Sequence, residues 1–544
     1  MPKTPKKPDL ATGLGSVLRY NRMMKRSPLW GIPALLMGVW ACTPTPPPAK
    51  PQFHAVTETP ARLDSVPSDM AVLNRVSWGA ETADAQILAR EGLRNWLDRQ
   101  LHPSADDGLP PDAAAEIAAM EISQKSIVQI QAEVRAMQQV AQKSKGSPDY
   151  DANQKAYQQK LNDLAREAQT RSLLRDLYSQ NQLKEQLTWF WMNHFNVHQN
   201  KNDIRALIGD YEETAIRPHV LGKFRDLLAA TAIHPAMLVY LDNSQNAKGH
   251  INENYAREIM ELHTLGVGSG YTQQDVQELA RILTGMGVNF TGEPAKVGPT
   301  LAVYHRGKDL FEFNPNRHDF GDKVFLGTPI KGSGINEVDD ALTILSVEPP
   351  TAHYISTELA EYFCCDNPSA SLVDAMAATF KSSDGDIAQV LRTLFASPEF
   401  KASLGQKFKD PIHYAVSALR AAYGQQVILN PQPLLNWLNR MGEPLYGHET
   451  PDGYAMNEAA WSGPGELETR FEIARQIGLG HSGLYKMLGD AAPEPAPPPL
   501  IQQTRYYQAL APTLSPATMQ AITQGQAPAD RNMLFLSSPE FMHR

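Results

Sequence analysis

Apolar residues recur at three- and four-residue spacing from about residue 70 onward, and this period predicts helices that bury one face. Two stretches rich in Gln, Ala, Lys and Glu, 113–143 and 151–178, carry the pattern on either side of the sequence Lys-Gly-Ser-Pro-Asp at 145–149. Glycine and proline interrupt a helix there, so we expect an antiparallel helical hairpin inserted at 113–170. Its charges are typical of a solvated face rather than of a binding site.

The pattern changes between residues 285 and 334, where Gly, Pro and Asn accumulate and short alternating runs occur at 309–313 and 323–326. Alternation of apolar and polar residues predicts strands, so we expect a small β-hairpin or an irregular excursion here. Helical patterns resume over 338–422. The sequence therefore predicts a mainly α fold, with one large multi-helix domain over 70–544 that carries the helical-hairpin insertion and the small β excursion.

An apolar run of about a dozen residues, 29–40, follows the basic pair Lys25-Arg26. The run is too short to cross a hydrocarbon core of about 30 Å as a helix. It therefore predicts a signal region over 1–41, with translation starting at Met23 or Met24. Ala41-Cys42 matches the end of a bacterial lipobox, which predicts cleavage before Cys42 and lipidation of that cysteine. The alternative is a cleaved secretory signal followed by an incidental cysteine.

Residues 43–52 read TPTPPPAKPQ, and prolines fix φ and remove backbone donors, so this segment is expected to be extended. Together, residues 42–69 are predicted to form a lipid anchor and a Pro-rich tether that hold a periplasmic body at a membrane. Thr43 is not the Asp that usually retains lipoproteins at the inner membrane, which favours the outer membrane.

The charge distribution argues against a nucleic-acid partner. The chain has a net charge of −9, and the first 41 residues contribute +6, which leaves −15 for the rest. A phosphate-binding surface normally shows as a basic excess. The three cysteines are Cys42 and the neighbours Cys364 and Cys365. Because a bridge between adjacent cysteines is strained and uncommon, a disulfide framework is not expected.

The densest polar segment is 252–263, NENYAREIMELH. On a helix at 100° per residue, four polar side chains share a sector of about 100°. The four are Asn254, Arg257, Glu258 and Glu261. If this stripe is exposed it is only a polar face, but if it is buried its charges must be paired or bind something. His263 lies on the opposite, apolar face and is expected to be structural.

Two further segments offer imidazoles. Asn193, His194 and His198 lie among the aromatic residues of 187–198, and two His at i and i+4 on a helix can share a metal. The alternative is that they are satisfied core histidines. His318-Asp319 falls in a Gly-rich loop and can be a metal pair, an acid/base pair or a source of turn hydrogen bonds.

Several familiar signatures are missing from the sequence. It contains no Gly-Lys-Ser/Thr phosphate loop, no Gly-x-Ser-x-Gly elbow, no His-Glu-x-x-His motif and no Cys-x-x-Cys-His haem site. One short motif, Ser-Pro-Glu-Phe, occurs twice, at 397–400 and 538–541. Serine as N-cap with proline at N1 is a helix start, so each copy is expected to begin a helix.

In combination, these segments resemble the bacterial domain-of-unknown-function family 1800. The resemblance runs from Leu73 to the end of the chain and rests on WMNHF at 191–195, HPAMLVYLDN at 234–243, NENYARE at 252–258, ELHTLG at 261–266, HD at 318–319, KDP at 409–411 and TPDGY at 450–454. The chain departs from the family pattern at Met286, where a Trp usually stands. The resemblance implies a helical exported protein, whose gene commonly neighbours one for a sulfatase-like family 1501 protein.

The leading hypothesis is one polar pocket that performs hydrolysis of an envelope component, such as a glycan, assisted by a divalent metal. Its expected catalytic residues are Arg257, Glu258, Glu261, His318 and Asp319; its expected binding residues are Asn193, Asn254 and Tyr255; and its expected metal ligands are His194, Glu258, Glu261 and His318. The alternative is a non-catalytic scaffold of an envelope assembly, in which the same stripe is an ion-pair network that fixes helix register.

Overall fold

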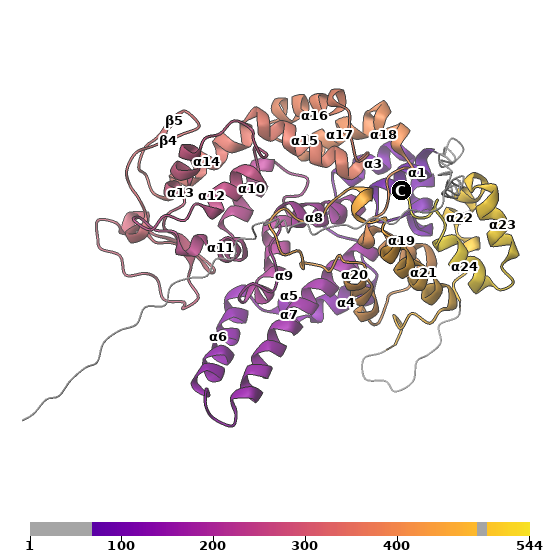
Figure 1. Ribbon diagram of the computed structural model, residues 1–544, viewed down its shortest axis with the longest axis horizontal. Helices are drawn as coiled ribbons and strands as arrows, with labels where there is room; N and C mark the ends of the chain where they lie inside the picture. The colour runs from indigo at the N-terminus through magenta and orange to yellow at the C-terminus, as the bar shows by residue number, and fades with distance from the viewer. Residues whose placement is uncertain (1–67, 487–497) are drawn as a thin grey trace, which may run out of the picture. The chain divides into compact units, whose positions relative to one another are not determined.

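The computed structural model describes residues 68–486 and 498–544 (Figure 1). The predicted signal region, Cys42 and nearly all of the predicted tether lie outside the described residues. Within the described residues the fold is mainly α, as the sequence predicts, because 61% of the structure is helical and only 5% is strand. None of the described helices combines the length and the apolar character that crossing a bilayer would need.

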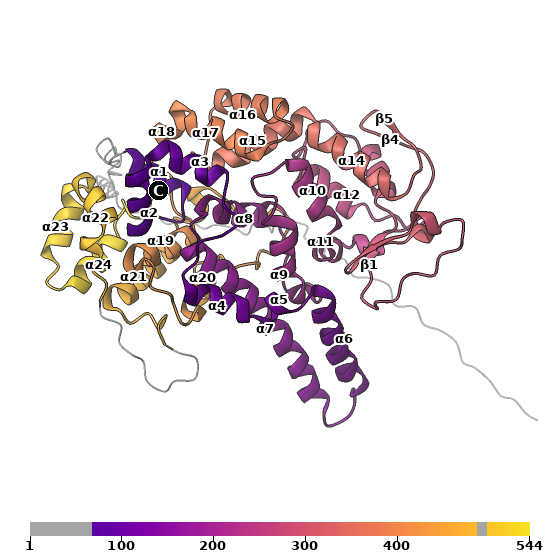
Figure 2. The same ribbon diagram turned by 180° about the vertical axis from the view of Figure 1, so that it is seen from behind.

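The first part of the described chain forms helices around a central, buried one. They are α1 (Ser68–Val76), α2 (Thr82–Glu91), α3 (Leu93–Leu101), α4 (Pro111–Ala119), α5 (Glu121–Gln124), α6 (Ile127–Lys143), α7 (Tyr150–Tyr178) and α8 (Gln182–His194). Every residue of α8 except Lys184 is buried, which explains why its sequence shows no single apolar face. Figures 1 and 2 show α8 in the middle of the helices.

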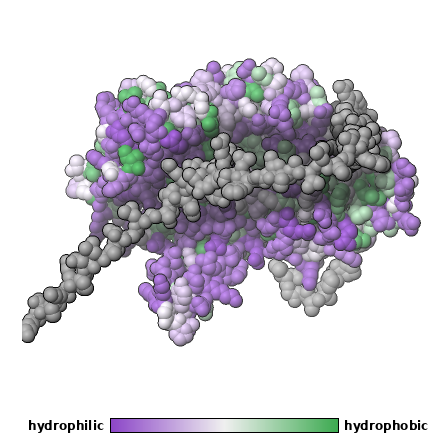
Figure 3. Space-filling model, in the orientation of Figure 1, coloured by the Kyte–Doolittle hydropathy of each residue, from purple (hydrophilic) through white to green (hydrophobic). Residues whose placement is uncertain are grey.

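The predicted hairpin is formed by α6 and α7, which project away from the other helices (Figures 1 and 2). Its boundaries differ from expectation at both ends. Residues 113–143 form three helices instead of one, because the chain breaks at Met120 and again before Ser126, which caps α6 in a capping box with Gln129. The last turns of α7 are buried in the body rather than exposed. Elsewhere the hairpin surface is mainly hydrophilic (Figure 3), as predicted.

The middle of the chain carries the polar segments. Its elements are η1 (Ile204–Ala206), α9 (Ile208–Asp210), the π-helical turn η2 (Tyr211–Ile216), α10 (Phe224–Ile233), α11 (Pro235–Tyr240), η3 (Asn243–Gln245), α12 (Asn254–Glu261) and α13 (Gln273–Ile282). The segment of NENYARE is therefore helical from Asn254, and α13 begins with a capping box of Thr272 and Asp275.

The β excursion consists of two small antiparallel sheets. A three-stranded sheet has the order β1-β3-β2, and a separate hairpin pairs β4 with β5. The elements are β1 (Met286–Val288), η4 (Ala302–Tyr304), β2 (Arg306–Lys308), β3 (Phe311–Phe313), η5 (Pro315–Arg317), β4 (Lys323–Phe325) and β5 (Thr328–Ile330). The sequence predicted β3 and β4, which fall in the alternating runs 309–313 and 323–326, but these two strands lie in different sheets. It did not mark β1, β2 or β5.

Helices complete the chain. They are α14 (Ile335–Val347), α15 (Pro349–Phe363), α16 (Ala370–Ser382), α17 (Ile387–Ala396), α18 (Pro398–Ser403), α19 (Pro411–Tyr423), α20 (Gln432–Arg440), η6 (Glu458–Ala460), α21 (Pro464–Leu479), η7 (Ile501–Gln503), α22 (Arg505–Leu510), η8 (Ala511–Thr513), α23 (Pro516–Gln524) and α24 (Pro528–Leu536).

The two Ser-Pro-Glu-Phe copies behave differently from each other. Ser397 caps α18 as predicted, and its hydroxyl accepts from the Phe400 amide. Ser538 makes the equivalent bond to Phe541, but only a single turn follows. The shared feature is instead the glutamate. Glu399 accepts a hydrogen bond from the backbone amide of Ser369, the N-cap of α16, and Glu540 accepts one from that of Ser515, the N-cap of α23.

Candidate functional site

The polar stripe of α12 exists as the sequence predicts. Tyr255, Ala256, Ile259 and Met260 are buried, while the stripe residues are at least partly exposed. The stripe is therefore neither sealed inside the protein nor a wholly solvated face.

Arg257 and Glu261 belong to a surface network between α12 and α13. The Arg257 guanidinium donates to the Gln273 side chain at 2.8 Å and lies 3.4 and 3.5 Å from Glu261 and Glu253. Glu261 also accepts a hydrogen bond of 2.6 Å from the Tyr271 hydroxyl. Burial and this carboxylate raise the pKa of Tyr271 to about 12. The Arg257 guanidinium is thus held by side chains on the surface of α12 and α13 and is not free to bind an anion.

Glu258 differs from its neighbours on the stripe. Among the described residues, none donates a hydrogen bond to its carboxylate. Burial raises the pKa of Glu258, the charges of Glu261 and Asp452 raise it further, and Arg257 only partly offsets them. The ionised form of this half-buried carboxyl is therefore less favourable than that of an ordinary exposed glutamate.

The second carboxylate, Asp452, comes from a loop 194 residues further along the chain, which is held to the end of α8. Asn193 donates to the Tyr454 carbonyl at 3.0 Å and accepts from the Tyr454 amide at 2.7 Å. Asn196 donates to the carbonyls of His448 and Thr450. The predicted binding residue Asn193 is therefore a positioning residue that fixes the loop of Asp452.

Gly453 allows the close contact between this loop and the end of α8. Its φ is +70°, and a Cβ there would lie 2.4 Å from the carbonyl oxygen of Asn193. A side chain at this position would be strained and would push the loop away from α8. The motif Thr-Pro-Asp-Gly-Tyr, which contributes to the family resemblance, thus has a local physical explanation.

Helix α15 supplies further acids. Tyr354, Glu358 and Glu361 are spaced by four and three residues, so they share one face of the helix. Burial raises the pKa of Tyr354, and the carboxylates of Glu358, Glu361 and Asp452 add to the effect. Burial also raises the pKa of Glu361, reinforced by Glu358. The acidic band, defined as Glu258, Glu358, Glu361 and Asp452, therefore links α12, α15 and the 448–454 loop through mutual electrostatic effects.

His194 sits beside this band. Its Nδ1 lies 2.5 Å from the Glu358 carboxylate and its Nε2 lies 3.2 Å from the carbonyl oxygen of His263. Both ring nitrogens therefore face an acceptor, and a neutral imidazole can donate to only one of the two at a time. The helix ends at His194, so His198 lies beyond it and the expected one-turn spacing of two imidazoles is lost. His263 is buried, as expected for a structural role.

The other two predicted binding residues contact backbone. The Tyr255 hydroxyl donates to the Ala232 carbonyl at 2.9 Å, and the Asn254 side chain donates to the Leu241 carbonyl at 3.4 Å. Tyr255 is only 1% exposed, so it contributes to the packing of α12 against α10 rather than to a surface that a ligand can reach.

His318 and Asp319 lie in a different cluster from the acidic band. His318 is buried, with Nε2 2.9 Å from Glu337 and Nδ1 next to Thr284, and Lys323 also contacts Glu337. Burial opposes ionisation of Glu337, but these two donors outweigh it and lower its pKa. Asp319 pairs with Arg281 at 2.9 Å. No hydrogen bond or ion pair joins either residue to Glu258 or Glu261 within the described chain.

The structure does not gather the four expected metal ligands. Within residues 68–486 and 498–544, the only group of three or more His, Cys, Asp or Glu ligand atoms that all lie within 4.8 Å of one another is Cys364, Cys365 and Glu399. His194 and His318 have protein partners at both ring nitrogens. The predicted single pocket is thus divided into the acidic band and the buried cluster around Glu337.

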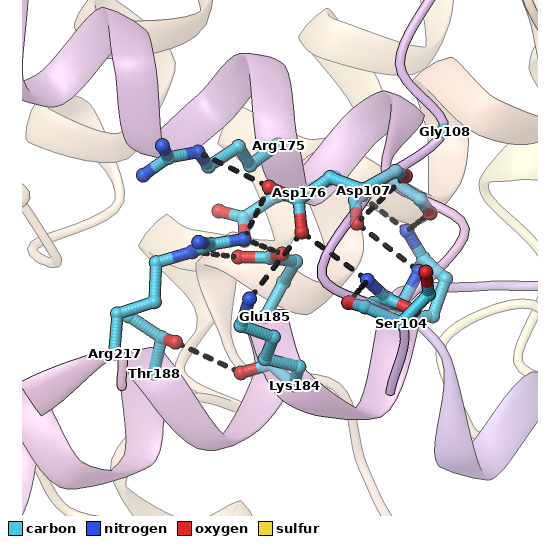
Figure 4. Close-up of polar contacts among 12 residues, drawn as sticks. Ser104, Asp107, Gly108, Arg175, Asp176, Lys184, Glu185, Thr188 and Arg217 are labelled. Carbon is cyan, nitrogen blue, oxygen red and sulfur yellow. Dashed lines mark hydrogen bonds and ion pairs between the residues drawn. The ribbon is translucent and has the colours of Figure 1, made fainter. Parts of the chain in front are cut away.

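A third polar cluster, which sequence reasoning did not reveal, joins the end of α7 and the start of α8 to Arg217 and to the loop before α4 (Figure 4). Arg217 lies 2.6 Å from both Glu185 and Asp107, and Lys184 lies 3.3 Å from Asp107. Burial opposes ionisation of Asp107, yet Arg217 and its other donors lower its pKa. Asp107 and Arg217 are 110 residues apart, so no local pattern connects them.

The band also contains residues that the sequence did not mark. Glu358 and Glu361 were missed because an acidic pair on a helix face has no specific spacing. Asp452 stood inside a recognised motif, but nothing in the sequence placed it near Glu258.

Fold and site together define a large helical protein with an acidic surface band, in which hydrogen bonds from Asn193 and Asn196 hold the loop of Asp452. The chain belongs to the family described as "Protein of unknown function (DUF1800)", whose pattern matches residues 71–543. The family resemblance seen in the sequence is thereby confirmed. No curated protein and no solved structure matches the chain.

Proposed function

We propose that this protein is a lipoprotein of the bacterial cell envelope that binds and hydrolyses a glycan at the acidic band. The basic pair, short apolar run, Ala41-Cys42 and Pro-rich tether support export, lipidation at Cys42 and a periplasmic body at the outer membrane. A sulfatase-like family 1501 protein is the proposed partner, on the basis of the family resemblance alone. Mass spectrometry of the N-terminal peptide from membranes tests the anchor, and an unmodified Cys42 would contradict it.

The observation that carries the proposal is the environment of Glu258. A half-buried carboxyl with a raised pKa is better suited to donate a proton than an ordinary glutamate, and a second carboxylate can stabilise positive charge or activate water. Asp452, which is largely exposed, is the proposed second carboxylate. Glycoside hydrolysis uses two such carboxyl groups, one as the proton donor and the other as base or nucleophile.

The chemistry of the band favours a neutral sugar or an amino sugar. Its four carboxylates repel phosphate and sulfate groups, while carboxylate oxygens accept hydrogen bonds from sugar hydroxyls and attract ammonium groups. The electrostatic effects of the band reach Tyr354, which is partly exposed and whose ring offers a surface on which a sugar can pack. Carboxylates also suit a hard divalent cation, so metal-assisted hydrolysis remains part of the proposal.

The test compares two glutamates one turn apart on α12. Full-length protein, Glu258→Gln and the control Glu261→Gln are incubated with peptidoglycan sacculi or chitosan oligomers, with Mg²⁺ or with a chelator. Loss of a general acid is expected to reduce the formation of new reducing ends about 100-fold or more in Glu258→Gln only. Equal activity in both variants, or no binding by the unmodified chain, would contradict the proposal.

A second candidate function is a non-catalytic scaffold of an envelope assembly. It is favoured by the polar side chains that form hydrogen bonds within the protein, notably His194, His318 and Asn193. This candidate predicts that Glu258→Gln leaves the copurification of envelope partners intact and that no glycan is cleaved under any of the conditions above.

A further inference from the structure

The vicinal cysteines lie where three helices meet, at the end of α15. Cys364 and Cys365 directly follow α15, Glu399 is in the first turn of α18, and Ser369 caps α16. Cys364 is buried, whereas Cys365 and Glu399 are partly exposed, so a small ion can reach the group from solvent.

The three ligand atoms have the separations of a metal-binding set. The two sulfurs are 3.5 Å apart, and Cys365 Sγ is 3.8 Å from Glu399 Oε1. Tetrahedral Zn²⁺, with Zn–S of about 2.3 Å and Zn–O of about 2.1 Å, places two sulfurs about 3.8 Å apart and a sulfur and an oxygen about 3.6 Å apart. All three ligand atoms lie within 4.8 Å of one another, so an ion can be seated once Cys364 Sγ and the Glu399 carboxylate close to the tetrahedral separation.

From this geometry we infer that Cys364, Cys365 and Glu399 form a binding site for zinc, with the fourth position open to solvent. Two thiolates and a carboxylate carry three negative charges. A Zn²⁺ ion and the guanidinium of Arg75 neutralise them, because Arg75 donates to the Cys364 carbonyl at 2.9 Å and its charge acts on both thiols. The site is independent of the proposed glycan chemistry.

Glu399 retains the capacity to bind a metal in its present contacts. Its two oxygens accept hydrogen bonds from the amide and the hydroxyl of Ser369, at 2.9 and 2.5 Å. A carboxylate has about four lone-pair positions, so these two bonds leave room for an ion. Zinc binding would thus tie the end of α15 to the starts of α16 and α18.

The second Ser-Pro-Glu-Phe copy provides a matched control. Glu540 accepts hydrogen bonds from the Ser515 amide at 2.8 Å and from the Thr518 hydroxyl at 3.0 Å, which is the same helix-capping role. No cysteine occurs near it in the sequence. Glu399→Gln and Glu540→Gln therefore remove the same charge from the same motif, but only the first removes a proposed ligand.

The experiment uses Co²⁺ as an optical probe and Zn²⁺ as competitor, on the reduced, metal-stripped full-length chain in detergent. Thiolate-to-cobalt charge-transfer absorption is expected at one ion per chain, and Zn²⁺ should abolish it. Cys364→Ser and Cys365→Ser should lose the band. Glu399→Gln should weaken binding about tenfold or more, while Glu540→Gln and Cys42→Ser stay within about twofold.

A second measurement guards against misfolded variants. Zn²⁺ should raise the thermal unfolding midpoint of the unmodified chain and of Glu540→Gln, because a ligand that binds only the folded state stabilises it, and it should not raise that of Cys365→Ser. The inference is overturned if no charge-transfer band forms, if Cys42→Ser abolishes it, or if Glu399→Gln and Glu540→Gln behave alike. Binding of Cu⁺ without Zn²⁺ would likewise overturn it.

Discussion

The acidic band and the buried cluster around Arg217 contain the same kinds of residue under opposite conditions. In the buried cluster, Glu185 and Asp107 share the Arg217 guanidinium, and nearby Glu213 pairs with Arg175. The pKa of Asp107 is lowered, and that of Glu213 falls to about 2, because their cations outweigh burial. In the band, burial and neighbouring acids raise the pKa of Glu258 and Glu361 instead.

The difference separates architecture from candidate chemistry. Guanidinium groups lower the pKa of Asp107 and Glu213, and these ion pairs join the segments around them. Glu258 and Glu361 form no ion pair among the described residues, and burial raises their pKa, so their ionised forms cost stability in the folded protein. In this protein, the carboxylates without a cationic partner therefore mark the candidate functional site.

The largest effect is expected from Arg217→Met. Removing the guanidinium leaves the buried Glu185 and the partly buried Asp107 without their main partner, which should lower the free energy of unfolding by about 3–5 kcal/mol. Urea denaturation monitored by circular dichroism measures it. The control is Arg392→Met, whose partner Asp98 is exposed, with an expected loss below about 1 kcal/mol. Similar losses in both variants would remove the distinction between the buried cluster and ordinary surface pairs.

The pH dependence of stability should differ in sign between the two regions. Lowered pKa values of Asp107 and Glu213 stabilise the fold above their unfolded pKa, and this contribution is lost as the pH falls from about 4 toward 2. The raised pKa of Glu258 acts oppositely: its contribution is full below the unfolded pKa and is lost as the pH rises through the folded pKa.

Glu258→Gln should therefore be more stable than the unmodified chain at pH 7, by less than about 1 kcal/mol, and equally stable below pH about 4. Urea denaturation at a series of pH values measures the difference. A variant that is less stable at pH 7 would mean that Glu258 is a structural partner.

The smallest effect is expected from Arg257→Gln. Its pairs with Glu253 and Glu261 are partly exposed i,i+4 contacts, each worth about 0.2–0.5 kcal/mol. The variant should lose less than about 1 kcal/mol by the same denaturation assay, and 1 M salt should abolish most of the difference because screening weakens exposed pairs. A loss comparable to that of Arg217→Met would show that the stripe of α12 is structural.

The sequence predicted individual polar elements more reliably than it predicted their assembly. The stripe of α12 followed from helical periodicity alone, and the structural role of His263 followed from its place on the apolar face. The convergence of His194, Glu258, Glu261 and His318 was inferred from their residue types and from the family motifs. The structure places His194 beside the acidic band through Glu358, but it places His318 in the separate buried cluster around Glu337. The sequence does not show whether a histidine that pairs with a carboxylate lines an open site or is buried. His318, which pairs with Glu337, is buried.

By itself, the sequence determined the mainly α class, the helical hairpin, the position of the β excursion and the family, because these depend on local periodicity, chain-breaking residues and motif identity. Only the tertiary structure decided which charges meet. Asp452 comes near Glu258 because Asn193 and Asn196 clamp its loop, and Arg217 reaches Asp107 across 110 residues. Burial and charge pairing fix the behaviour of a carboxylate, and both arise only when distant segments pack together.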